Sequence, residues 1–292
     1  MSTTAGHGLK TPSRARPLPA GPLGIWSTKR KVQRVDLRNL IGLGRSGQRE
    51  DAVSRSAKAA RILELISNHM SIQGLRVLDF GAGAGYIAAH IQDAVGHKGH
   101  VVAADVVNQM WTAAVPFLQV ERMSLSVNDG SFDLIISNHV LEHVGDADAQ
   151  RRYLTECKRL LVDDGLLYLA HPNRWSVFEP HLRAPFLSWP PEQYRNTYLR
   201  LLQRIGVARR IRRSDTLVGH YGIRPLSRRQ TAKLLSDCGY HFVDVTPDMI
   251  RLICARELGS AARLILAPLA YAFYWIFRPI VPTIIFVARI RQ

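Results

Sequence analysis

Cysteine is scarce in this sequence of 292 residues. Its three cysteines, Cys157, Cys238 and Cys254, are widely spaced and form no C-x-x-C pair. The pattern argues against a disulfide framework and against a zinc site, and it favours the reducing environment of the cytoplasm. No metal ligands are predicted. The first residues also lack the apolar stretch of a secretory signal, so no such signal is expected.

The sequence also lacks an apolar run long enough to cross a membrane, which takes ~20 residues. Residues 264–277 form an uncharged stretch of fourteen, bracketed by Arg263 and Arg278. Aromatic residues gather near one end of it, as they do at membrane interfaces. We therefore expect 258–281 to hold an apolar helix lying in the plane of a membrane surface. A buried core helix and a true span are the alternatives. The aromatic residues concerned are Tyr271, Phe273, Tyr274 and Trp275.

Acidic residues are few beside basic ones. The 39 Lys and Arg outnumber the 23 Asp and Glu, which gives a net charge of +16. Such a charge attracts anionic surfaces, and both nucleic acid and anionic lipid are candidates. Residues 1–24 are rich in Gly, Pro, Ser and Thr, and 25–49 are basic, so we expect 1–50 to be a flexible basic arm.

The most informative feature that is present is a glycine-rich turn. An apolar strand is expected over 75–80 and a helix over 86–95, and three glycines separate them. Glycines at such a turn let the backbone approach a ligand, and the helix N-terminus offers free N–H groups. A second strand over 100–104 then leads to Asp105, a carboxylate suited to ribose hydroxyls. The pattern predicts a nucleoside-binding βαβ unit. The glycines are Gly81, Gly83 and Gly85.

The spacing indicates which nucleoside binds. A dinucleotide fingerprint requires a third glycine where this sequence has Tyr86. The sequence Asp79-x-Gly81-x-Gly83-x-Gly85 instead resembles motif I of the class I methyltransferases that use S-adenosylmethionine. In that resemblance Asp105 corresponds to the ribose-binding acid.

A second segment extends the resemblance. Residues 121–144, ERMSLSVNDGSFDLIISNHVLEHV, are similar to the small-molecule "type 11" branch of these methyltransferases, apart from Ser126 and Val127, where Pro and Phe are usual. The resemblance implies S-adenosylmethionine as cofactor, with Glu121 near the adenine or ribose, Arg122 and Met123 beside the adenine, and Asn138 near the methionine. The implied cofactor-binding residues are Asp79, Gly81, Ala82, Gly83, Gly85, Asp105, Val106, Glu121, Arg122, Met123 and Asn138.

The remaining pattern predicts an α/β fold. The family resemblance implies a doubly wound, mostly parallel sheet of seven strands in the order 3-2-1-4-5-7-6, with the last strand antiparallel. This methyltransferase domain would fill 51–292, with an insertion at 172–225 after the fifth strand. Helices are expected over 51–70, 106–115, 146–162 and 228–238, and further strands over 117–121, 132–137, 166–170, 241–246 and 283–288.

The insertion at 172–225 is expected to roof the acceptor site, because ligands bind beyond the carboxyl ends of parallel strands. Its opening, PNRWSVFEPHLRAPFLSWPP, resembles bacterial methyltransferases associated with glycan or glycolipid assembly. Its aromatic residues alternatively build only a local core. No acid lies between Glu192 and Asp215, and seven arginines there predict either a phosphate-binding patch or a solvated helix face. These are Arg195, Arg200, Arg204, Arg209, Arg210, Arg212 and Arg213.

An oxygen acceptor needs a base to remove its proton, and histidine is the usual choice. The candidates are His139, His143, His171 and His181. His171 follows the expected fifth strand and His139 the fourth, so we favour His171 first and His139 second. A nitrogen acceptor bound as the free amine would require no base.

Taken together, these features predict O-methylation of an amphipathic or lipid-linked acceptor by a cytoplasmic enzyme peripheral to the membrane, with an anionic membrane surface as partner. The alternative is an RNA methyltransferase that uses the basic arm and the arginines. Against base-amino methylation, Ser137-Asn138-His139-Val140 stands where an N/D-P-P-Y/F motif is usual. A non-catalytic subunit of the same fold is disfavoured because Asp79, the glycines and Asp105 are all present. No oligomeric state is predicted.

Overall fold

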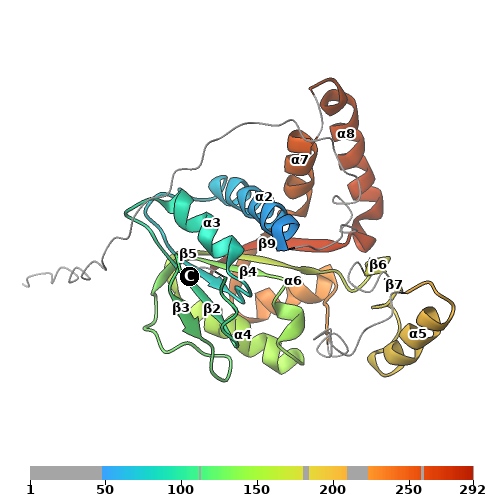
Figure 1. Cartoon of the computed structure of the whole chain (residues 1–292), viewed down its shortest axis with the longest axis horizontal. Coiled ribbons are helices and arrows are strands. Elements are labelled where there is room, and N and C mark those ends of the chain that lie inside the picture. Colours follow the sequence, from blue (N-terminus) through green and yellow to red (C-terminus); the bar gives the residue numbers. More distant parts are fainter. Residues whose placement is uncertain (1–47, 112, 180–183, 209–222, 258–259, 292) are drawn as a thin grey trace, which may run out of the picture. The chain divides into compact units, whose positions relative to one another are not determined.

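The computed structural model describes residues 48–111, 113–179, 184–208, 223–257 and 260–291 (Figure 1). The chain divides into two units, Met1–Arg34 and Val35–Gln292. The first unit lies outside the described residues, as do 35–47 and 209–222. The expected basic arm and the boundary at residue 50 therefore stay predictions, and so does any role of Arg209 to Arg213.

The described fold is built around a seven-stranded sheet in the order β3-β2-β1-β4-β5-β9-β8. The strands from β1 to β5 pair in parallel, whereas β9 is antiparallel to both β5 and β8. The expected strand order and its antiparallel last strand are confirmed. The strands are β1 (Arg76–Phe80), β2 (His100–Asp105), β3 (Phe117–Gln119), β4 (Phe132–Asn138), β5 (Leu161–Pro172), β8 (Tyr240–Asp244) and β9 (Thr283–Ile290).

Helices cover both faces of the sheet, as Figure 1 shows. One apolar core joins the sheet to α2, α3 and α7, through side chains such as Ile62, Ile91 and Met249. A second core joins the opposite face to α4 and α6, through Leu154 and Leu235. Two buried faces explain why β1 and β4 are nearly continuous apolar runs. The helices are α2 (Gln48–Ser67), α3 (Tyr86–Val95), α4 (Ala147–Leu160), α6 (Arg228–Asp237) and α7 (Thr246–Glu257).

The insertion after β5 contains a short hairpin of β6 (Phe178–Glu179) and β7 (Ala184–Pro185), followed by α5 (Glu192–Arg204). Ala184, Leu199, Leu202 and Ala208 form a small core of their own there. The sequence did not predict the hairpin, whose strands are only two residues long.

The prediction of a helix over 106–115 is wrong. The described residues of this stretch form bends without helical hydrogen bonds. Asn108 Oδ1 accepts the N–H of Met110 at 3.1 Å, and the N–H of Trp111 donates to Ala84 O at 3.2 Å. An Asn side chain that bonds nearby backbone competes with helix formation, and here it turns the chain back over the glycine loop.

The boundary between α4 and β5 also differs from the prediction. The helix ends at Leu160, and β5 begins at Leu161 rather than at Leu166. Pairing with β4 jumps from Phe132–Leu161 to Leu134–Leu166, so residues 162–165 form an irregularity within the strand. The polar sequence Asp163-Asp164-Gly165 was expected to end the helix, but it occupies this bulge, where both carboxylates face solvent.

The end of β8 was predicted two residues too late. Thr246 belongs to α7, a helix that the sequence did not predict, and Asp244 Oδ1 accepts the N–H of Thr246 at 3.1 Å. Chain order continues through α8 (Ser260–Phe277) into β9. Among the described residues, no helix is both long enough and apolar enough to cross a membrane.

Asn173 joins the end of β5 to the connection between α8 and β9. Its side chain is 2% exposed, and its Nδ2 donates to Pro279 O at 2.8 Å and to Val281 O at 2.9 Å. Its Oδ1 accepts the N–H of Trp175 at 3.1 Å. One buried amide therefore fixes the start of the insertion and the base of α8 together.

Candidate active site

The turn between β1 and α3 adopts a backbone that favours glycine. Gly81, Gly83 and Gly85 have φ values of 88°, 55° and 78°. A Cβ atom on Gly81 would lie 2.3 Å from Val140 Cγ2, and one on Gly85 would lie 2.4 Å from Met110 Cε. A Cβ atom on Gly83 would meet nothing within 4 Å. The loop is thus closed on two sides by protein and open at Gly83, where a ligand can approach the backbone.

Asp105 at the end of β2 braces this loop. Its Oδ2 accepts the N–H of Gly83 at 2.8 Å, and its Oδ1 accepts the N–H of Val106 at 2.7 Å. The N–H groups of Gly81 and Ala82 donate to Ala104 O at 2.7 and 3.0 Å. Each carboxylate oxygen retains a further lone pair, so Asp105 can hold the loop and still accept a ribose hydroxyl.

The residues expected near adenine form a tight turn after β3. Glu121 and Ser124 exchange backbone hydrogen bonds of 3.1 and 2.9 Å, and Arg122 and Met123 between them have φ values of 49° and 70°. The N–H of Val120 donates to Asp105 O at 2.9 Å, which fixes the turn beside the ribose-binding candidate. Glu121 and Arg122 are exposed and Met123 is partly buried.

Two side chains of α4, not predicted from the sequence, hold the segment after this turn. Glu156 Oε1 accepts the N–H of Leu125 at 2.9 Å and the hydroxyl of Ser124 at 3.0 Å. Arg159 bonds to that same carboxylate at 2.7 Å and donates to the carbonyl oxygens of Leu125 and Val127 at 3.0 and 2.8 Å. The only sequence signal was an acid and an arginine one helical turn apart, which is common on helix surfaces.

Three buried acceptor atoms near the carboxyl ends of β1 and β4 have no hydrogen-bond partner. They are Asp79 Oδ2, Asn138 Oδ1 and Glu142 Oε2. Buried acceptors are rarely left unpaired, because losing their hydration costs free energy. S-adenosylmethionine carries an ammonium and a sulfonium at its methionine end, so this group of acceptors fits the cationic end of that cofactor. When bound, the cofactor supplies an electrophilic methyl group.

The carboxyl of Asp79 is strongly affected by its burial. Burial raises the pKa of its carboxyl to about 7, a neighbouring N–H at Ala88 partly offsets this, and the charge of Asp105 adds to it. A buried carboxylate without a cation is unfavourable, so a cationic ligand would stabilise its ionised form.

His139 lies at the exposed end of β4, next to the glycine loop. Its φ is 61°, and its N–H donates to Ala170 O at 2.7 Å. Its Nδ1 lies 3.5 Å from Glu142 Oε1, and its side chain is 35% exposed. The Nε2 of His143 lies 3.8 Å from the same oxygen. Burial raises the pKa of Glu142. A positively charged neighbour would therefore favour the ionised form of this carboxyl group.

His171, the first choice from the sequence, lies inside the fold. It is 1% exposed, and burial lowers its pKa. Its Nδ1 lies 2.9 Å from Pro172 O, an acceptor, so Nδ1 carries the proton and Nε2 accepts from the Thr231 hydroxyl at 2.8 Å. Both ring nitrogens are engaged, and the geometry favours His139 over His171 as a base. His181 lies outside the described residues.

Lys58 on α2 is a further group that the sequence did not single out. Its pKa is lowered to about 8, mainly by burial and also by the positive charges of Arg55 and Arg61. The negative charge of Glu142 acts in the opposite direction and raises the pKa. Arg55 itself lies over the ring of Tyr86, which stacks on Trp111 at 4.8 Å. Helix α2 therefore contributes basic side chains beside the cofactor loop, from a part of the sequence outside the recognised motifs.

Replacing Asp105 with Ala removes the brace on Gly83 and the proposed ribose acceptor together. We expect S-adenosylmethionine to bind ~100-fold more weakly, since charge-assisted hydrogen bonds are lost. Calorimetric titration measures the change. Asp93→Ala, an exposed carboxylate on α3, is the matched control and should bind normally. Wild-type affinity in folded Asp105→Ala protein would contradict this assignment.

Replacing Asp79 with Asn should separate stability from cofactor binding. The carboxyl pKa is raised from its ordinary value of 3.8 to about 7 on folding, so ionising it costs stability as pH rises through that window. At pH 8 the variant should be more stable than the wild type by about 4 kcal/mol, and below about pH 3 the difference should vanish. Urea unfolding at several pH values measures this. The same variant should bind S-adenosylmethionine more weakly, and a pH-independent stability difference would refute the buried-charge account.

Comparison with known proteins identifies the family of this chain. The model of the methyltransferase domain family matches residues 51–215, more than half of the chain. Over 119 residues the chain is 32% identical to a ubiquinone/menaquinone biosynthesis C-methyltransferase from Vibrio vulnificus, which covers 37% of this chain and 44% of that protein. Over 127 residues it is 30% identical to a ubiquinone biosynthesis O-methyltransferase from Rhizobium rhizogenes, covering 41% and 46%. The chain spans about half the length of the curated relatives it matches.

Among solved structures, the YcgJ protein from Bacillus subtilis is similar at a TM-score of 0.46 and 19% identity, over 80% of this chain and 98% of that one. The family match covers the glycine loop, Asp105, the turn after β3 and the segment from His139 to His143. This protein therefore belongs to the methyltransferase domain family, the class I enzymes that use S-adenosylmethionine.

Proposed function

We propose that this protein transfers a methyl group from S-adenosylmethionine to a hydroxyl oxygen of an amphipathic or lipid-linked small molecule at a membrane surface, with His139 as the base. The observation that carries the proposal is the pairing of partly exposed His139 with buried Glu142 beside the glycine loop. The relatives named for ubiquinone biosynthesis support a small-molecule acceptor, and their names include both C- and O-methylation.

The position of His139 suits the removal of a proton from an acceptor. The next residue, Val140, packs on Gly81, where the cofactor's methionine end is expected. A base at that point can reach a hydroxyl placed in line with the transferred methyl group. Glu142 would orient the imidazole through Nδ1 and stabilise the imidazolium that forms when His139 takes the proton.

In this arrangement the protein orients its two substrates and keeps water away. Trp111 and Arg55 lie over or beside Tyr86 at the start of α3, and Met110 contacts Gly85. These side chains lie beside the glycine loop, and the insertion after β5 is the proposed roof on the acceptor side. Methyl transfer depends mainly on such orientation and on a dry site.

Replacing His139 with Asn should lower methyl transfer by ~100-fold or more, while S-adenosylmethionine binding stays within about twofold of the wild type. The assay supplies radiolabelled cofactor and a fractionated cell extract, and it counts label in lipid, RNA and protein fractions. His171→Asn is the comparison, because the first choice from the sequence predicts the reverse pattern. Full activity of His139→Asn on the labelled acceptor would remove this residue from the mechanism.

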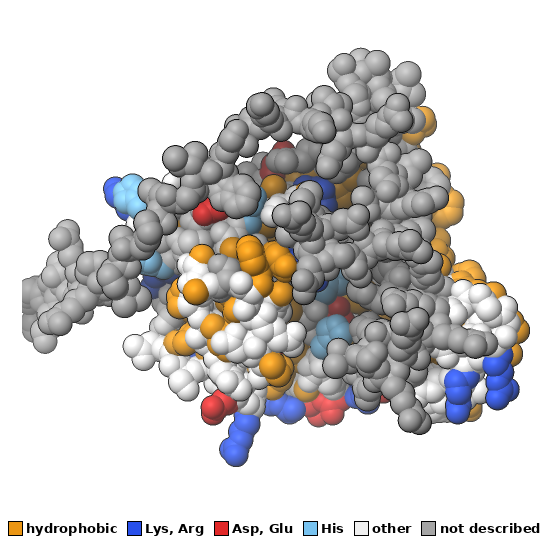
Figure 2. Space-filling view, viewed as in Figure 1, with side chains coloured by type: hydrophobic (Ala, Val, Ile, Leu, Met, Phe, Trp, Pro, Cys, Tyr) orange, Lys and Arg blue, Asp and Glu red, His pale blue; other side chains and the backbone are white. Residues whose placement is uncertain are grey.

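The proposed membrane surface is formed by the end of α8. Leu269, Trp275, Ile276 and Phe277 are 58%, 50%, 71% and 37% exposed. Figure 2 shows hydrophobic side chains along the outer edge of this helix. Two arginines accompany them: Arg251 lies 4.0 Å from the ring centroid of Tyr271, and Arg278 lies 4.9 Å from that of Trp275. Apolar side chains flanked by positive charge fit a bilayer that contains anionic lipid.

Tyr274, which the sequence grouped with these aromatic residues, faces inward. It is 2% exposed, and its hydroxyl donates to Asp244 Oδ2 at 3.4 Å. Helix α8 therefore packs on the domain along one side and presents the other to solvent. The exposed side supports a shallow interfacial role.

We expect the protein to sediment with vesicles that contain phosphatidylglycerol, and less so at high salt. Changing Trp275, Ile276 and Phe277 to Ser should largely abolish this binding, because apolar burial is lost. The matched control changes three exposed apolar residues elsewhere, Leu201, Ile205 and Val207, to Ser. If wild-type protein stays in the supernatant at low salt, the membrane part of the proposal fails. Label found in RNA would then favour the RNA methyltransferase alternative.

A further inference from the structure

We propose that a pocket beside the active site, formed by Arg174, Arg195 and Arg224, binds a phosphate group of the acceptor. The identification of the ligand as the acceptor rests on the function proposed above. The binding of phosphate itself does not, and it can be measured without methyl transfer.

The pocket has a volume of about 270 Å³ and lies where four segments of the chain meet. The N-terminus of α4 contributes Ala147 and Gln150, the start of α5 contributes Glu192 and Arg195, and Arg174 and Arg224 come from the two ends of the insertion. Three guanidinium groups from distant parts of the sequence thus line one small volume.

The charges around the pocket do not balance. Three arginines and one acid, Glu192, line it, which leaves a net charge of +2. Arg224 pairs with Glu192 through Nε and Nη2, both at 3.1 Å. Another carboxylate within electrostatic range of Arg224, that of Asp146, caps α4 by accepting the N–H of Ala149 at 2.9 Å. A phosphate monoester carries a charge near −2 at neutral pH and would neutralise the excess.

Arg195 is held in place by neutral groups. Its Nε donates to Pro190 O at 3.1 Å, and its Nη1 donates to Ile223 O at 2.9 Å. Burial and the nearby charges of Arg174 and Arg224 lower its pKa. Backbone carbonyls fix the direction of the guanidinium without cancelling its charge. An arginine fixed in this way is preorganised to bind phosphate oxygens.

The pocket is attached to the catalytic segment by direct hydrogen bonds. The N–H of Arg224 donates to Glu142 O at 2.9 Å. The Nε2 of Gln150 donates to Leu141 O at 3.2 Å and to Arg224 O at 3.0 Å. The wall that carries Arg224 is therefore bonded to the residue paired with His139. A phosphate held there would anchor an acceptor whose hydroxyl reaches that histidine.

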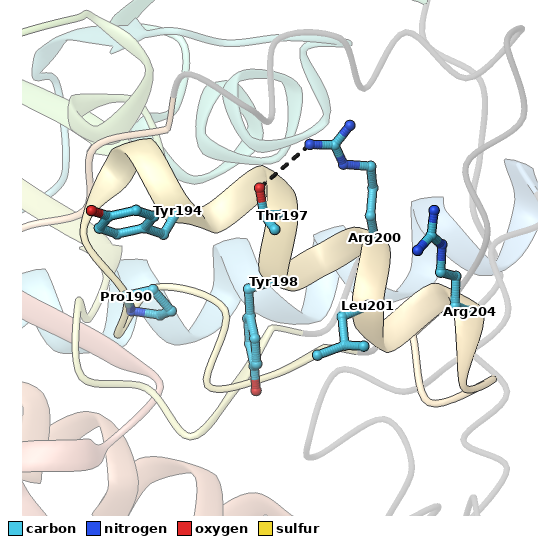
Figure 3. Close-up of a pocket in the computed structure, with 7 residues that line it drawn as sticks. All are labelled: Pro190, Tyr194, Thr197, Tyr198, Arg200, Leu201 and Arg204. Atoms are coloured by element: carbon cyan, nitrogen blue, oxygen red, sulfur yellow. Dashed lines mark hydrogen bonds between the residues drawn. The ribbon is translucent and has the colours of Figure 1, made fainter.

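The larger hollow on α5 shows a different arrangement. It has a volume of about 610 Å³ and is lined by side chains of α5 and by Pro190. Figure 3 shows Arg200 and Arg204 pointing to one side of the helix and Tyr198 and Leu201 to the other, with Arg200 bonded to Thr197. These arginines do not converge, whereas those of the smaller pocket meet around one volume.

Calorimetric titration with inorganic phosphate at constant ionic strength tests the proposal on the full chain. Wild-type protein should bind phosphate saturably. Arg224→Gln should weaken binding about tenfold or more, because a charge-assisted hydrogen bond and a positive charge are lost. Arg229→Gln, an exposed neighbour with the same change in charge, should bind as the wild type does. Glu192→Gln should bind phosphate more tightly, because it removes the opposing carboxylate.

Arg195→Gln should also weaken binding, but it removes bonds to Pro190 and Ile223 and risks local unfolding. Arg224→Gln and Glu192→Gln keep the test decisive in that case.

Glycerol phosphate and a short-chain phosphatidic acid, titrated in parallel, distinguish a polar acceptor from a lipid-borne phosphate. The absence of saturable binding, an equal loss in Arg229→Gln, or weaker binding in Glu192→Gln would overturn the proposal. S-adenosylmethionine affinity, measured in the same samples, should be unchanged, which separates this result from a failure of the cofactor site.

Discussion

The contact between Gly81 and Val140 is the constraint on which the site depends. Gly81 has no side chain, so Val140, which follows β4, can pack directly against the backbone that follows β1. The glycine loop can therefore lie close to His139. Asp105 fixes the other side of the loop through the N–H of Gly83. The glycine loop, proposed to bind the cofactor, and the proposed base thus lie close together at the edge of the sheet, although nearly sixty positions separate them in the chain.

The same edge gathers buried groups that are unfavourable for the protein alone. Asp79, Asn138 and Glu142 each have an acceptor atom without a partner, and burial raises the pKa of both acids. A fold selected only for stability would pair or replace these groups. In the proposed site, a bound cationic ligand would stabilise the ionised forms of Asp79 and Glu142, which are unfavourable in the protein alone.

Local signals in the sequence were enough to predict most of the fold. Ser227 illustrates this: it forms a capping box with Gln230 at the start of α6, where the sequence predicts a helix from residue 228. The glycine turn was predicted from a short motif and the strands from their apolar runs, whereas the strand order was implied by the family resemblance. The helix expected over 106–115 failed because Asn108 and Ala84 offer the backbone other partners, and Ala84 lies more than twenty positions away.

The candidate site was less predictable where it depends on distant contacts. The sequence placed His171 correctly at the end of β5, but its burial depends on Thr231, sixty positions later. The arginines of the phosphate pocket likewise come from both ends of the insertion, and only Arg195 belonged to the run that the sequence singled out. Position along a strand follows from periodicity, whereas the direction of a side chain depends on what the rest of the chain packs against it.

Asn173 has a consequence for how the enzyme could open. Its amide supplies both N–H groups to the carbonyl oxygens of Pro279 and Val281, and its oxygen holds the first turn of the insertion. If the roof over the acceptor swings away and takes Asn173 with it, two carbonyls at the foot of α8 lose their donors. Movement of the first turn of the insertion would therefore disturb the connection between α8 and β9. If the exposed side of α8 contacts a membrane, as proposed, then membrane contact and movement of the insertion would be coupled through this one residue.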